Sequence, residues 1–115
     1  MLNYTTITIN DTDYRCRLSA RNCVELEKKM KKNPLNVFMT LADGSVYPNL
    51  DDMMLIFHAS LQKFHHNISL EDTYDIFDEY VDEGHTLIDL IPFLLEIFQV
   101  SGLIPKEGEE ENPNE

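Results

Sequence analysis

Residues 51–66 of this chain read DDMMLIFHASLQKFHH, without glycine or proline and with few β-branched side chains. This composition favours a helix. Apolar side chains cover most of its circumference and leave a narrow polar strip, which is typical of a helix buried at the centre of a small domain. We therefore expect a central helix that begins near Asn49 or Leu50 and ends near His66 or Asn67, with the rest of the chain packed around it.

The N-terminal segment predicts a β-hairpin. Residues 4–9 (YTTITI) are rich in β-branched side chains, and residues 14–18 (YRCRL) alternate apolar and polar ones. Turn-forming residues from Asn10 to Asp13 lie between them. Because an isolated hairpin is only marginally stable, its apolar face should pack against helices.

Further helices are expected on both sides of the central one. The predicted N-caps Ser19, Ser69 and Thr86, together with stop signals, place them over residues 20–32, 70–83 and 87–101. A short helix or turn is expected over residues 34–41. In the helix over residues 70–83, the expected apolar face consists of Leu70, Thr73, Tyr74, Phe77, Tyr80 and Val81.

These elements together predict an α+β fold that is mainly α: an N-terminal β-hairpin followed by four or five packed helices. We expect residues 1–102 to form a single globular domain. Residues 103–115 are rich in Glu, Pro and Gly and have too few apolar side chains to be buried. They are expected to form a disordered acidic tail.

Charge is distributed unevenly along the chain, whose net charge is −12. Residues 1–32 carry seven of the nine basic side chains and four acids, a net charge of +3, and residues 33–115 carry −15. Such an acidic chain should be repelled by nucleic acid and by anionic membranes. The basic block either binds an acidic partner or faces the acidic half of the same protein, and we prefer the second interpretation.

Neither a membrane span nor a targeting segment is indicated. No apolar run reaches the roughly 18–20 residues that a transmembrane helix needs. The N-terminus, MLNYT, has neither a basic region nor an apolar signal core. The sequence therefore predicts a cytoplasmic protein with no membrane partner.

No residue pattern indicates catalysis or metal binding. His58 and His65 are seven residues apart, whereas zinc-binding pairs on a helix are usually about three to four apart. Cys16 and Cys23 form no CxxC motif and are expected to be reduced, mostly buried thiols. Motifs such as GxSxG, a phosphate loop or GxGxxG are also missing from the sequence. We therefore predict a protein that is not an enzyme and needs neither metal nor cofactor.

The remaining signal is an excess of methionine and aromatic side chains over what a small helical core needs to bury. Methionine-rich faces adapt to varied partners. We expect a client-binding surface on the central and last helices. The candidate residues are Met53, Met54, Phe57, Phe93 and Phe98.

The order of these parts resembles a known family. The resemblance rests on residues 6–10 (TITIN), 14–18 (YRCRL), 24–29 (VELEKK), 33–35 (NPL) and 72–80 (DTYDIFDEY), with an acidic tail after residues 101–103 (SGL). These segments are similar to those of the tail assembly chaperones of long-tailed bacteriophages and prophages of Gram-positive bacteria. The resemblance covers about residues 4–104.

The resemblance implies a non-enzymatic role in virion morphogenesis. Such chaperones bind the tape measure protein, help to recruit tail tube subunits, work in the cytoplasm of the bacterial host and are absent from the mature virion. Many are made in two lengths by a programmed frameshift, and this chain would be the short form. Ile104, Pro105 and Lys106 belong to the residue types that a slippery sequence can encode, and self-association is compatible with the same role.

Two other functions stay open at the level of sequence. The carboxylates of Asp75, Asp78, Glu79 and Asp82 fit an acidic inhibitor that imitates DNA towards a basic host protein, which predicts salt-sensitive binding. A minor structural protein of the phage tail is the third interpretation, and it predicts that the chain is present in purified virions.

Overall fold

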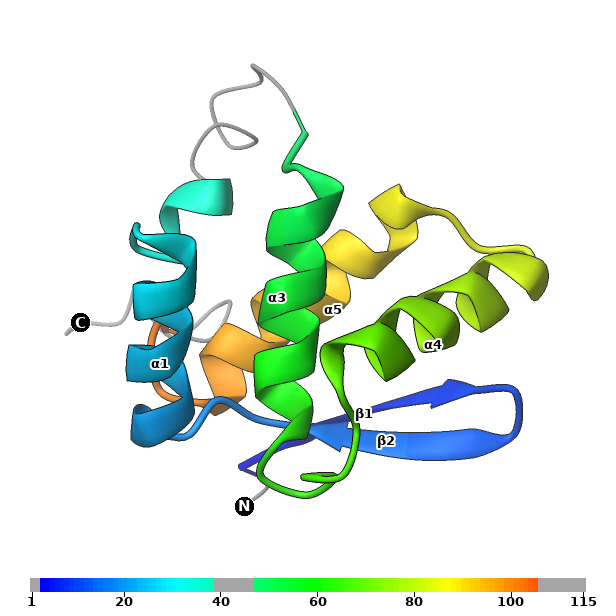
Figure 1. The fold of residues 1–115 in the computed structure, drawn as a ribbon, viewed down its shortest axis with the longest axis horizontal. Coiled ribbons are helices and arrows are strands. Elements are labelled where there is room, and N and C mark those ends of the chain that lie inside the picture. Colours follow the sequence, from blue (N-terminus) through cyan, green and yellow to red (C-terminus); the bar gives the residue numbers. More distant parts are fainter. Residues whose placement is uncertain (1–2, 39–46, 106–115) are drawn as a thin grey trace, which may run out of the picture.

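The computed structural model describes residues 3–38 and 47–105 of the chain. Strands β1 (Thr5–Ile9) and β2 (Thr12–Cys16) are followed by helices α1 (Ala20–Met30), α3 (Leu50–Leu61), α4 (Leu70–Asp82) and α5 (Leu87–Val100), as Figure 1 shows. Residues 36–38 are also helical. This order confirms the predicted α+β class with mainly helical content. The predicted acidic tail beyond residue 105 and the predicted element beyond residue 38 lie outside the described residues.

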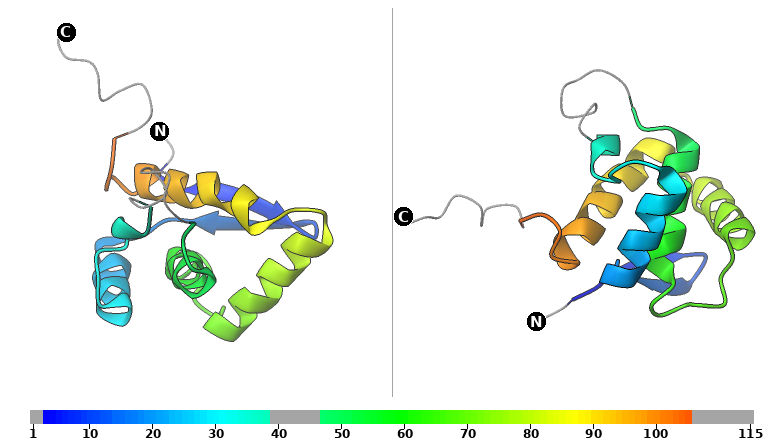
Figure 2. Two further views of the ribbon diagram at one scale, coloured as in Figure 1. Left: turned by 90° about the horizontal axis from the view of Figure 1, so that it is seen from above. Right: turned by 60° about the vertical axis from the view of Figure 1, so that its left-hand side comes forward.

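Helix α3 occupies the centre of the fold, as residues 51–66 predicted. It contacts α1, α4, α5 and strand β2. In Figure 1, α1 and α4 lie on either side of α3 and α5 crosses behind it, and both views of Figure 2 agree with this arrangement. Met53, Ile56, Phe57 and Leu61 are completely buried, so the apolar circumference of α3 forms the middle of the core.

Helix α3 ends at Leu61 rather than near His66. The side-chain amide of Gln62 donates hydrogen bonds to the backbone oxygens of His58 and Ile68, both at 3.0 Å. One side chain thereby binds a carbonyl of the last helical turn and the returning chain. The prediction of a longer helix was wrong because this polar contact reverses the chain while the apolar pattern continues to Phe64.

The hairpin turn is shorter than the sequence predicted. Asn10 and Asp11 have φ angles of 52° and 63°, and two successive positive φ angles are required by a type I′ turn of two residues. Thr12 and Asp13, predicted to lie in the turn, therefore belong to β2. The strands pair antiparallel without a bulge, from Ile9 opposite Thr12 to Thr5 opposite Cys16.

Helix α4 is rotated relative to the face that the sequence predicted. Its buried residues are Thr73, Ile76 and Tyr80, whereas Tyr74 and Val81 are 39% and 42% exposed. Thr73 can be buried because its hydroxyl donates to the backbone oxygen of Ser69 at 2.9 Å. The exposed Tyr74 becomes available for a surface groove.

The end of α3 and the loop after it cover part of the outer edge of β2. The backbone N–H of Arg17 donates to the backbone oxygen of Ser60 at 2.9 Å. The backbone N–H of Arg15 donates to Nε2 of His65 at 3.0 Å. Both donors point away from β1, so α3 and its following loop occupy two of the donors that an added strand would use.

Candidate functional site

An apolar groove lies between α3 and α4, which are neighbours in the fold (Figure 1). Its volume is about 310 Å³. We call it the α3–α4 groove, and its lining residues are Leu50, Asp51, Met54, Tyr74, Phe77 and Asp78. Four of the six side chains are apolar or aromatic, and the two carboxylates are exposed to solvent.

Helical spacing brings the groove residues together. Leu50 and Met54 are four residues apart on α3, and Tyr74 and Phe77 are three apart on α4, so each pair shares one face of its helix. Leu50 is 47% exposed and Tyr74 39% exposed, whereas Met54 is almost fully buried. The methionine thus forms the floor of the groove, and the two exposed side chains form its walls.

Capping fixes the direction in which α4 presents this face. The Ser69 hydroxyl accepts a hydrogen bond from the Asp72 backbone N–H, and the Asp72 carboxylate accepts one from the Ser69 N–H, both at 3.0 Å. This capping box anchors the first turn, one turn before Tyr74.

The predicted client-binding residues belong mainly to the core. Met53, Met54, Phe57 and Phe98 are at most 1% exposed, and Phe93 is partly buried. Phe57 packs edge-to-face on Phe93 with ring centroids 6.2 Å apart. These residues therefore do not form an exposed surface in this structure, and Met54 is the one member that lines the α3–α4 groove. Their binding of a client stays a prediction.

Sequence analysis missed Leu50, Tyr74 and Phe77 as groove residues. Tyr74 and Phe77 were assigned to a buried face, and Leu50 was regarded only as the start of the central helix. The sequence does contain a signal for Tyr74. Thr73 and Ile76 form a stripe at helical spacing, and Tyr74 directly follows Thr73. Adjacent residues of a helix point in different directions, so only one of Thr73 and Tyr74 can lie in the core.

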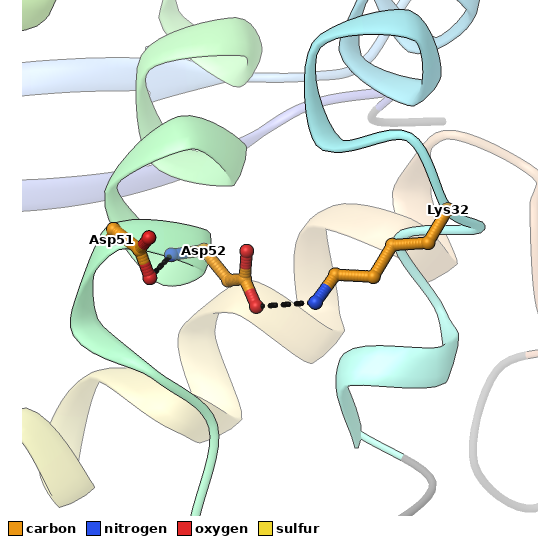
Figure 3. Close-up of polar contacts among 3 residues, drawn as sticks. All are labelled: Lys32, Asp51 and Asp52. Carbon is orange, nitrogen blue, oxygen red and sulfur yellow. Dashed lines mark hydrogen bonds and ion pairs between the residues drawn. The ribbon is translucent and has the colours of Figure 1, made fainter.

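The basic block of the sequence makes one ion pair with the acidic part of the described chain. Nζ of Lys32 lies 2.8 Å from Oδ2 of Asp52, whose backbone N–H donates to Oδ1 of Asp51 at 2.8 Å (Figure 3). This pair joins the end of α1 to the first turn of α3. Lys28, Lys29 and Lys31 are exposed, so the preferred interpretation of the basic block holds for Lys32 within the described residues.

Comparison with protein families matches residues 3–112 to the Family of unknown function (DUF6096). The chain belongs to the DUF6096 family. The comparison with curated proteins gave no match, and the comparison with solved structures gave none. Within residues 3–38 and 47–105 of this DUF6096 chain, no helix is both long and apolar enough to cross a membrane.

A second, more polar groove of this DUF6096 chain lies between α1 and α3. It has a volume of about 210 Å³ and is lined partly by Asn22, Glu25, Lys29, His58 and Gln62. Burial, and secondarily the nearby Lys29, lower the pKa of His58. In the part of the chain that the structure describes, no group of three or more His, Cys, Asp or Glu side chains could hold a metal ion.

The outward side of α4 carries the acids that the sequence singled out. Asp75, Asp78 and Asp82 are exposed and Glu79 is half-buried. The DUF6096 chain therefore presents two distinct features on α4: the apolar side chains of the α3–α4 groove and, beside them, a row of carboxylates.

Proposed function

We propose that this chain is an assembly chaperone of the phage-tail type, which binds an apolar helical segment of the tape measure protein in the α3–α4 groove. The observation that carries this proposal is the groove itself, with an apolar floor and two half-exposed apolar walls, Leu50 and Tyr74. Recognition of an amphipathic helix by such a groove is a recurring mode of protein binding. In this proposal the protein is not an enzyme and acts in the host cytoplasm.

The dimensions and chemistry of the groove suit one or two large apolar side chains of a client helix. Full burial of such a side chain is worth about 1.5–3 kcal/mol, so a short segment would bind reversibly. Reversible binding is what an assembly chaperone requires, because the client must later enter the tail.

The rim of the groove adds a charge preference. Asp51 lies in the first turn of α3, and Asp78 lies on α4 beside Phe77. Both carboxylates favour a client helix that carries Lys or Arg next to its apolar stripe. The net charge of −12 also supports solubility of the loaded complex through mutual repulsion between complexes.

Two further parts of the proposal concern production and assembly. The chain is the short form of a frameshifted pair, and the complex recruits tail tube subunits. Expression of the native gene with its downstream DNA, followed by mass analysis of the products, tests the first part. A second, longer product that shares residues 1 to about 106 is expected.

The groove is tested with surface substitutions that spare the core. We expect the double substitution Leu50→Asp and Tyr74→Asp to weaken binding of the full chain to the tape measure protein of the same phage by at least about tenfold, or about 1.4 kcal/mol. Isothermal titration calorimetry with both purified proteins measures this change. Val81→Asp is the matched control, because Val81 is 42% exposed on the same helix and does not line the groove.

Equal weakening by the groove variant and by Val81→Asp would contradict the groove as the binding site. Failure of the unaltered chain to bind the tape measure protein, or its presence in purified virions, would contradict the chaperone function itself.

A second candidate function is an acidic inhibitor that imitates DNA, and the row of carboxylates on α4 favours it. Asp75, Asp78 and Asp82 are exposed, and no ion pair involving them occurs within the described residues. The substitutions Asp75→Asn, Glu79→Gln and Asp82→Asn separate the two functions, because they leave most of the groove unchanged. Binding to the tape measure protein that survives both these substitutions and high salt supports the chaperone. Binding to a basic host protein that is lost under both conditions supports the inhibitor.

A further inference from the structure

The outer edge of β1 is open in the described part of the chain. Adjacent residues of a strand point their backbone groups to opposite sides. Thr5, Ile7 and Ile9 face β2, so Thr6 and Thr8 direct their N–H and C=O groups outward. Within residues 3–38 and 47–105, no hydrogen bond occupies these outward groups, in contrast to the outward N–H of Arg15 on β2.

Strand β1 itself lacks the features with which proteins usually prevent strand pairing. Protective features include charged side chains, prolines and bulges. Strand β1 reads TTITI, its two outward-directed threonines are exposed, and its pairing with β2 has no bulge. All five residues are β-branched, which is the composition that pairs most readily.

We propose that β1 pairs antiparallel with β1 of a second copy of this chain, so that two hairpins form one four-stranded sheet. A sheet of two strands, the number in the described residues, is marginal by itself, and additional strands stabilise it. This inference does not depend on the proposed client groove, which lies on α3 and α4.

Charge at the two ends of the hairpin favours a second copy as the partner. The turn end carries Asp11, Asp13 and Glu83, whose carboxylate accepts the Asn10 N–H, and the open end carries the basic Arg15 and Arg17. Antiparallel pairing about a twofold axis places the acidic end of each copy near the basic end of the other. The ends therefore attract each other at both sides of the interface.

The structure also selects one register. The N–H of Asn10, the next outward donor after Thr8, already donates to Oε2 of Glu83 at 2.6 Å. Among the described residues, Thr6 and Thr8 are therefore the two members of β1 whose outward groups have no hydrogen-bond partner. If Thr6 lies opposite Thr8 of the second copy, then Thr8 lies opposite Thr6 of that copy, and each of these two pairs exchanges two N–H···O bonds. A register centred on either threonine forms only one such pair.

In the selected register, like-charged side chains at positions 6 and 8 face each other directly across the interface. We expect Thr6→Lys with Thr8→Lys to abolish the dimer through this repulsion. Thr6→Glu with Thr8→Lys should restore it, because each Glu then lies opposite a Lys of the other copy. Both positions are exposed, so both variants should fold, and circular dichroism of each verifies this.

Analytical ultracentrifugation of the full chain over a wide range of protein concentration is the test. The expected result is a mass that rises from the 13.4 kDa of one chain to twice that value for the unaltered protein and for the Glu/Lys variant, while the Lys/Lys variant stays monomeric. A monomeric unaltered protein, or a Lys/Lys variant that still dimerises, would overturn the pairing. A monomeric Glu/Lys variant would overturn the register.

Discussion

At the scale of single residues, the two cysteines have different surroundings and should react differently. Cys16 is fully buried, and burial raises the pKa of its thiol to about 12. Cys23 is only partly buried, and its pKa is raised by burial and secondarily by Glu27. The thiolate is the reactive form of cysteine, so neither thiol should be unusually reactive, and Cys16 should be the slower by far.

We predict that a thiol reagent at about pH 8 modifies one cysteine of the native protein and two of the unfolded protein. Mass spectrometry of the modified chain measures the number. The variant Cys23→Ser should show no modification until it is unfolded. Rapid modification of Cys16 in the native variant would mean that β2 opens readily.

The imidazole of His65 acts as a neutral hydrogen-bond acceptor. Its Nε2 accepts the Arg15 backbone N–H at 3.0 Å. Burial, and secondarily the charge of Arg15, lower the pKa of His65 below 6.5. Because the folded state disfavours protonation, this histidine contributes stability above its unfolded pKa, and the contribution is lost as the pH falls through the folded pKa.

The free energy of unfolding should therefore decrease as the pH falls from about 7 to about 5. In His65→Gln the decrease should be smaller, since an amide oxygen can accept the same bond without titrating. His66→Gln, at an exposed position, is the control and should retain the slope of the unaltered protein. Denaturant unfolding at several pH values measures all three, and identical slopes for the two variants would contradict the role of His65.

At the scale of elements, the helix starts were the most predictable feature. Ser19, Ser69 and Thr86 were predicted as N-caps, and each accepts a backbone N–H from the first turn of its helix. Ser69 and Thr86 also form complete capping boxes with Asp72 and Asp89. Caps are local in sequence, so residue type and spacing suffice to identify them.

We predict that Ser69→Ala and Thr86→Ala each lower the free energy of unfolding by about 1 kcal/mol. Each substitution removes the side-chain oxygen that accepts the backbone N–H of the third helical residue. Asn67→Ala, an exposed loop position just before α4, should change it by less than about 0.5 kcal/mol. Urea denaturation compares the three variants, and equal effects would show that the caps do not stabilise α4 and α5.

Helix ends and faces were less predictable because they depend on distant contacts. The end of α3 is set by the Gln62 amide, which reaches Ile68 across the loop. The buried face of α4 depends on whether Tyr74 or Ile76 packs into the core, and either residue fits an apolar stripe at helical spacing. The candidate groove can be located only when the helix ends and the buried faces are known. Met54 is therefore the one residue of the groove that could be predicted from sequence as part of a binding site.

At the scale of the whole molecule, negative charge is poorly compensated. The net charge is −12, and Lys32–Asp52 is the one pair of a lysine or arginine with a carboxylate in the described ranges. Because like charges are held closer together in the folded state, folding is opposed by self-repulsion that salt screens.

The free energy of unfolding should consequently rise when NaCl is increased from about 10 mM to about 150 mM, where the screening length falls from about 30 Å to about 8 Å. We expect a gain of up to about 1 kcal/mol, measured by thermal or urea unfolding at constant pH. Lys28→Glu, which adds to the imbalance at an exposed site, should increase the dependence on salt. A decrease of stability with salt would show that attractive pairs outweigh the repulsion.

The partly closed edge of β2 leaves β1 as the edge along which the hairpin pairs most readily. Ser60 and His65 occupy the backbone donors of Arg17 and Arg15, so a strand that joins this sheet meets two occupied donors on the β2 side and, within the described residues, none on β1. A molecule that pairs through one sheet edge stops assembling at the dimer, because the pairing edge of each copy is then occupied by the other copy. Stacking into long β-fibres, which requires two free edges per molecule, is thereby opposed by Ser60 of α3 and by His65 in the loop that follows it.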